Sequence, residues 1–166
     1  MIDRPSSWIG IDLRSRPGDW IRELTPGDIA ELEHAATRFL SLGIDVGEIS
    51  TDVFPLPTLS ARLADLRHTL INGIGFQLLR GLPVDRYDKR FAAAMFCGIG
   101  AHIGNARSQN ASGHILGHVR NVGADAADTS TRIYQTAERQ TFHTDSTDVV
   151  GLLCLVQARR GGESLL

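Results

Sequence analysis

Three segments of the chain place apolar residues three and four positions apart, which is the period of an amphipathic helix. They span residues 25–43, 58–73 and 88–103. The first opens with Thr25 as a capping residue and Pro26 at the first helical position, and a glycine ends each of the first two. The pattern therefore predicts three helices before residue 104.

Shorter segments carry strand and loop signals. Residues 76–80 form a short, mainly apolar run closed by Gly81, which is typical of a strand. Residues 114–122 and 133–136 are interpreted as two further strands, separated by a polar surface loop at 123–131.

The first 24 residues mix Trp8, Trp20 and several isoleucines with Pro and Gly, without a sustained period. We interpret residues 1–24 as an extended N-terminal arm that packs its two tryptophans onto the domain. No repeat or domain boundary is visible, so residues 1–166 are expected to form a single domain.

An uninterrupted apolar run extends from Val149 to Val156. Its length and composition predict a strand that is buried on both faces. A turn at Arg159 and Arg160 and two glycines follow the run.

A histidine and a carboxylate, His143 and Asp145, come directly before this run. In an extended backbone, positions two apart project to the same face, so both side chains could bind one metal ion. An imidazole nitrogen with a carboxylate oxygen is the ligand mixture of non-haem iron sites that keep open positions. The alternative is a surface histidine beside a solvated aspartate.

His114 and His118 form a rival pair, four residues apart as in helical zinc motifs. Gly113 and Gly117 argue against a helix there, and the glutamate of such motifs is missing. His102 is expected to be a core or helix-end histidine.

The chain resembles the TauD/TfdA-like dioxygenases, which use Fe(II) and 2-oxoglutarate. The resemblance is carried by the sequences GIGFQLLRGLP at 73–83, GAHIGNARSQNASG at 100–113, and FHTDS, DVVGLLCL and GGES within 142–164. It implies an α+β fold with a partial double-stranded β-helix (jelly-roll) and flanking N-terminal helices, truncated at the C-terminal side.

The resemblance also implies site residues. His143 and Asp145 would be two of three iron ligands, and Ser164 would lie near the 2-oxoglutarate carboxylate. The distal histidine and the arginine that pairs with 2-oxoglutarate in relatives would lie beyond Leu166. Gln109 and Asn110 are in a loop that often lines the substrate pocket of relatives, although capping of the loop backbone explains them equally well.

Arg139 and Gln140 directly precede the metal motif, and they too could face the pocket.

The composition excludes some classes of function but identifies no further site residues. Seventeen basic and 19 acidic residues give a net charge of −2, which offers no electrostatic footprint for nucleic acid or an anionic membrane. Cys97 and Cys154 are each surrounded by apolar residues and are interpreted as reduced core residues of a cytoplasmic protein. No apolar run approaches the roughly 20 residues of a membrane span.

The sequence therefore predicts an Fe(II)/2-oxoglutarate-dependent dioxygenase that uses O₂ to oxidise a small molecule. The 166-residue chain alone is expected to be inactive, and to aggregate or to hide its apolar run in a homo-oligomer. The alternatives are a non-catalytic truncated remnant and a cupin-like metal-binding domain.

Overall fold

The computed structural model describes residues 5–110, 113–120, 122–123, 136, 138–161 and 165. The chain divides into two compact units, Met1–Ala106 with Gly151–Leu166, and Arg107–Val150. Every helix and strand found in the described residues belongs to the first unit.

The three predicted helices are confirmed as α3 (Pro26–Ser41), α4 (Leu59–Asn72) and α5 (Lys89–Ala101). Thr25 begins α3 as predicted, because its hydroxyl accepts from the amide of Asp28 while the Asp28 carboxylate accepts from the amide of Thr25. These reciprocal bonds satisfy two amides that a helix start otherwise leaves unpaired.

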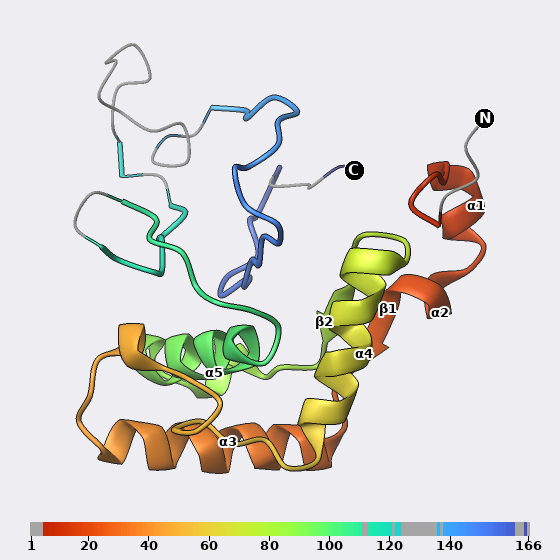
Figure 1. The fold of residues 1–166 in the computed structure, drawn as a ribbon. Coiled ribbons are helices and arrows are strands. Elements are labelled where there is room, and N and C mark those ends of the chain that lie inside the picture. Colours follow the sequence, from red (N-terminus) through yellow and green to blue (C-terminus); the bar gives the residue numbers. More distant parts are fainter. Residues whose placement is uncertain are drawn as a thin grey trace. The chain divides into compact units, whose positions relative to one another are not determined.

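A core of apolar side chains forms where α3 and α5 lie side by side, with α4 crossing near one end of α3 (Figure 1). The loop between α3 and α4, which includes the 3₁₀ turn η1 (Val46–Glu48), contributes a fully buried aromatic ring. The largest fully buried side chains are Leu32, Phe39, Phe54, Leu56, Leu59, Leu63 and Met95.

Two short parallel strands join distant parts of the first unit. β1 (Ile21–Glu23) pairs with β2 (Leu78–Arg80). The predicted strand at 76–80 is confirmed in β2, whereas β1 was not predicted. A 3₁₀ turn, η2 (Val84–Arg86), follows β2.

The N-terminal residues are folded where an extended arm was predicted, with helices α1 (Gly10–Arg14) and α2 (Pro17–Trp20). The ring centroids of Trp8 and Trp20 lie 5.2 and 5.9 Å from that of Phe76, and the Trp8 indole donates to the Ile74 carbonyl at 2.8 Å. Packing of both tryptophans was predicted correctly.

The run from Val149 to Val156 is not a buried strand. None of its residues is assigned to a strand, and Leu152 and Val156 are 74% and 85% exposed. A strand that is apolar on both faces needs neighbouring strands and a covering layer, and the described residues provide neither here. Cys154 in this run is exposed, so its assignment to the core was wrong, while Cys97 is half-buried.

Two other strand predictions have different outcomes. Residues 113–120 and 122–123, which contain most of the predicted strand at 114–122, have no strand assignment. Most of the predicted strand at 133–136 and of the loop at 123–131 lies outside the described residues. The two-stranded sheet neither confirms nor contradicts the predicted jelly-roll.

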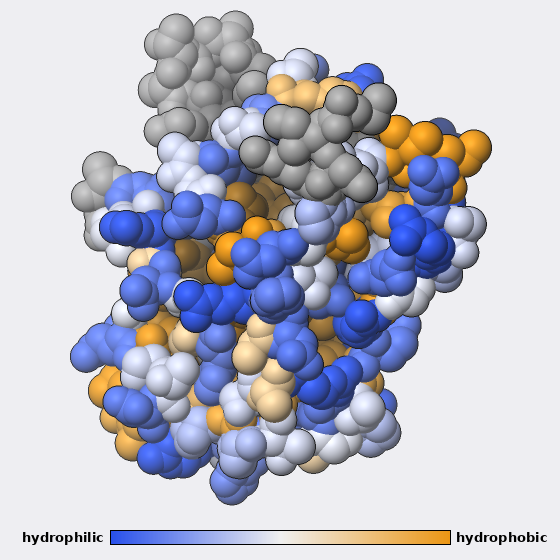
Figure 2. Space-filling view, turned by 45° about the vertical axis from the view of Figure 1, so that its right-hand side comes forward, coloured by the Kyte–Doolittle hydropathy of each residue, from blue (hydrophilic) through white to orange (hydrophobic). Residues whose placement is uncertain are grey.

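Hydrophobic residues are visible among hydrophilic ones on the face drawn in Figure 2. Exposed large apolar side chains of the described residues include Ile9, Ile11 and Ile71. Of the helices in the described part of the chain, none has both the length and the apolar character needed to cross a membrane.

Candidate metal centre

The ring of His143 is held by the backbone two residues before it. Its Nδ1 lies 2.8 Å from the carbonyl oxygen of Thr141. Because a carbonyl oxygen only accepts, Nδ1 carries the proton and donates it, which leaves the lone pair on Nε2. Metal-binding histidines in proteins use this arrangement, in which the other ring nitrogen donates to a carbonyl or a carboxylate.

The lone pair of His143 and the carboxylate of Asp145 converge. Nε2 of His143 lies 3.8 Å from Oδ1 of Asp145, and the two side chains are 47% and 52% exposed. First-row metals bind nitrogen and oxygen at about 2.1 Å, so two ligand atoms at tetrahedral or neighbouring octahedral positions are about 3.0–3.4 Å apart. The pair therefore fits a shared metal ion in donor type and in access from solvent, and the two atoms have to approach by about 0.4–0.8 Å to bind it.

The part of the chain that the structure describes provides no third protein ligand: within it, no group of three His, Cys, Asp or Glu side chains could hold a metal ion. Ser164, expected to bind 2-oxoglutarate, lies outside the described residues.

The amides of Gln109 and Asn110 are engaged within their own loop. Asn110 Nδ2 lies 2.9 Å from Nδ1 of His114, and Asn110 Oδ1 accepts from the His114 amide at 3.2 Å. The Gln109 side chain donates to the carbonyl of Arg107 at 3.0 Å. These bonds are the loop capping that was weighed against substrate binding, and both residues remain exposed.

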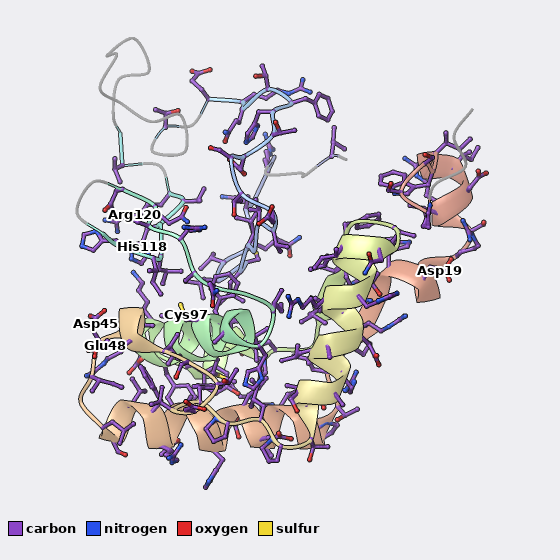
Figure 3. The ribbon with its side chains drawn as sticks, viewed as in Figure 1. Asp19, Asp45, Glu48, Cys97, His118 and Arg120 are labelled. Carbon is purple, nitrogen blue, oxygen red and sulfur yellow. The ribbon has the colours of Figure 1, made fainter. Side chains whose placement is uncertain are left out.

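The rival pair lacks the geometry of a helical zinc motif. Residues 113–120 contain no helix, so His114 and His118 are not stacked on successive helical turns. Figure 3 labels His118 on the irregular trace that follows α5.

Two contacts that orient His143 were not predicted from the sequence, although Gln140 was expected to be able to face the pocket. Gln140 Nε2 lies 3.1 Å from Nε2 of His143, and the Thr141 carbonyl accepts a hydrogen bond from the other ring nitrogen. The position of Gln140, three residues before the histidine, was a usable signal. Every residue has a backbone carbonyl, so the sequence does not reveal which carbonyl accepts from the histidine.

A separate cleft of about 420 Å³ lies in the helical unit, between α3 and residues 51–60. His102, at the end of α5, borders it and donates from Nε2 to the Phe54 carbonyl at 2.9 Å, as expected of a helix-end histidine. Arg38 donates to the Val53 carbonyl at 3.3 Å. Both side chains thus hold the loop that carries Phe54.

Cys97 extends from α5 (Figure 3). Burial raises the pKa of the Cys97 thiol to about 11, so the thiol is protonated at neutral pH. A protonated thiol is a poor nucleophile, which argues against nucleophilic chemistry at Cys97.

Comparison with known proteins identifies related chains. Residues 38–166 match the model of the family described as "Taurine catabolism dioxygenase TauD, TfdA family". The chain is 32% identical over 145 residues to FR-33289 synthase of Streptomyces rubellomurinus, a match that covers 87% of this chain and 43% of the relative. It is 31% identical over 167 residues to the taurine hydroxylase-like protein SAT17 of Stachybotrys chartarum, covering 96% of this chain and 43% of the relative. The chain thus spans less than half the length of these curated relatives.

Proposed function

The chain belongs to the taurine catabolism dioxygenase TauD, TfdA family, and on that premise we propose that His143 and Asp145 are two protein ligands of a catalytic Fe(II). Members of the family are Fe(II)- and 2-oxoglutarate-dependent dioxygenases. The proposed activity is oxidation of a C–H bond in a small molecule, with O₂ and 2-oxoglutarate as co-substrates.

The observation that carries this proposal is the convergence of Nε2 of His143 and Oδ1 of Asp145 at 3.8 Å. The bond from Nδ1 to the Thr141 carbonyl supports it, because it selects the tautomer whose unprotonated nitrogen, Nε2, is the one near the carboxylate. A surface histidine beside a solvated aspartate would not need a fixed tautomer.

Iron and 2-oxoglutarate, when bound, supply the oxidising chemistry. The residues of this chain bind and orient. His143 has to be neutral and Asp145 ionised to act as ligands, so protons compete with the metal and binding weakens on acidification. We assign Ser164 to the 2-oxoglutarate carboxylate, and Gln109 and Asn110 to polar groups of the substrate once their loop bonds are exchanged.

The name of one relative supports oxygen insertion as the reaction class, because it is called a taurine hydroxylase-like protein. The other is called a synthase, a name that does not state the reaction class. We propose hydroxylation or oxidative cleavage for the protein that carries this chain. Neither name assigns a substrate to it.

Metal binding tests the proposal directly. Anaerobic calorimetric titration with Fe(II) should show one site in the parent chain, and His143→Ala or Asp145→Ala should weaken it by at least about 10- to 100-fold, as loss of a metal-orienting group does. His114→Ala is the matched control, since its ring bonds to Asn110 in the same unit. Equal losses from His114→Ala and His143→Ala would reject the assignment.

A second measurement separates the dioxygenase from a cupin-like metal-binding domain or a non-catalytic remnant. In the protein that carries this chain, added 2-oxoglutarate should tighten Fe(II) binding if the protein is a dioxygenase, because the co-substrate supplies further ligands to the same ion. An Fe(II) affinity that depends on His143 but does not respond to 2-oxoglutarate would favour the cupin-like alternative.

A further inference from the structure

We propose that Gln140 controls the access of metal to His143: its side-chain amide occupies the ligating nitrogen in the metal-free chain and has to leave when metal binds. The inference rests on the proposed function, since it concerns access of the metal to the same nitrogen. It assigns to Gln140 a role in setting metal affinity.

The direction of the hydrogen bond follows from the neighbouring contact. The Thr141 carbonyl fixes the proton on Nδ1, so Nε2 of His143 can only accept. The Gln140 nitrogen at 3.1 Å is therefore the donor, and its distance is normal for a hydrogen bond between two nitrogens. The ring is held at both nitrogens by residues within three positions of it.

The amide and a metal ion exclude each other at this nitrogen. An imidazole nitrogen has a single in-plane lone pair, which can accept one hydrogen bond or bind one metal. Asp145, at 3.8 Å, is outside hydrogen-bond distance of the same nitrogen, so the partner of Nε2 in the metal-free chain is Gln140.

The amide can leave without disturbing the fold. Gln140 and His143 are both exposed, and both belong to the unit Arg107–Val150. When metal displaces the Gln140 amide, the amide exchanges its hydrogen bond to His143 for one to water. The bond from Nδ1 to Thr141 keeps the ring in place. Loss of the amide should raise metal affinity by about 2- to 10-fold, the range set by the net contribution of one hydrogen bond.

The test uses Co(II) titration of the 166-residue chain by calorimetry. Gln140→Ala and Gln140→Leu should both bind Co(II) about 2- to 10-fold more tightly than the parent, because neither side chain can donate to the histidine. Gln157→Ala is the matched control: Gln157 is an exposed glutamine for which the described residues provide no hydrogen bond, and its loss should leave the affinity unchanged.

A spectroscopic measurement distinguishes the loss of the hydrogen bond from Gln140 to His143 from a general effect of the substitution on folding. Nitrogen-15 NMR of the metal-free chain should show His143 protonated at Nδ1 in the parent and in Gln140→Ala, with only the Nε2 resonance shifted in the variant. Far-UV circular dichroism should be the same for all variants, since the helices lie in the other unit.

The outcomes distinguish this inference from the function on which it rests. Parent binding that is lost in His143→Ala, combined with unchanged or weaker binding in Gln140→Ala, would overturn the role of Gln140 and leave the metal centre intact. Tightening in Gln140→Ala but not in Gln140→Leu would also overturn it, because bulk and not the hydrogen bond would then shield the nitrogen. No Co(II) binding that depends on His143 would reject the metal centre itself.

Discussion

Replacing Gly98 of α5 with alanine should destabilise the helical unit through one identifiable clash. A Cβ at this position would lie 2.4, 2.5 and 2.6 Å from three atoms of the Phe54 ring. Carbon atoms pack best at about 3.5–4.0 Å, so ring or helix would have to move. Phe54 is fully buried, with its ring centroid 6.3 Å from that of Phe39, so a movement of the ring would disturb other core side chains.

The size of the effect comes from two opposing terms. Overpacking of a filled core costs about 1–3 kcal/mol, and three contacts below 3 Å with one fully buried ring place this substitution at the upper end. Alanine gains about 1 kcal/mol over glycine inside a helix. We therefore expect a net loss of about 2 kcal/mol in the free energy of unfolding.

Gly100 provides the matched control, because it lies in the same helix and a Cβ there would have no heavy atom within 4 Å. Gly100→Ala should be neutral or stabilising by up to about 1 kcal/mol, so the two variants should differ by about 2–3 kcal/mol. Urea unfolding followed by far-UV circular dichroism measures both. Equal stability of Gly98→Ala and Gly100→Ala would refute the packing argument, and partial recovery of Gly98→Ala by Phe54→Leu would support it.

Two further predictions concern the acid range and the apolar run. Burial raises the pKa of Asp28, but hydrogen bonds from Thr25 and Arg62 outweigh burial and lower this pKa below 3.8. The ionised carboxylate should therefore stabilise the fold fully above pH 3.8, and this contribution should be lost as the pH falls through the lowered pKa. Asp28→Asn should cost about 1–2 kcal/mol at pH 7 through the weakened helix cap, and should flatten the acid limb of a stability curve measured by urea unfolding. The exposed side chains of Leu152 and Val156 should drive concentration-dependent association, since burial of one such side chain contributes about 1.5–3 kcal/mol. Light scattering should show smaller particles for Leu152→Lys with Val156→Lys, whereas a monodisperse parent monomer would contradict this prediction.

The elements that sequence analysis predicted correctly are those whose signals are local. α3 begins with a capping box between Thr25 and Asp28, only three residues apart, and α5 begins where Asp88 accepts from the amide of Phe91. Helical hydrogen bonds and caps connect near neighbours, so the sequence contains both partners within one short window. His102 was placed correctly at a helix end for the same reason.

The elements that were missed or wrong depend on distant partners. β1 has three residues and exists because it pairs with β2 far along the chain. The run from Val149 to Val156 has the composition of a buried strand, yet composition states only that burial is favourable and does not supply the neighbours that would bury it. Leu152 is therefore exposed despite its apolar surroundings in the sequence.

The metal motif depends partly on local contacts and partly on distant ones. His143 and Asp145 therefore lie near each other although the strand that was predicted to follow them is not formed. His143 is oriented by Thr141 and Gln140, both within three residues, so its tautomer and direction are set locally. Asp145 is different: in the described part of the chain its polar neighbour is His143 itself, at 3.8 Å. A carboxylate held by one exposed contact retains much of its rotational freedom, and ordering it costs free energy when metal binds. The histidine ring is therefore oriented in advance, with only the Gln140 amide to be displaced, whereas the aspartate is not, so we expect the ordering of Asp145 to lower the affinity of this pair in addition to the effect of Gln140.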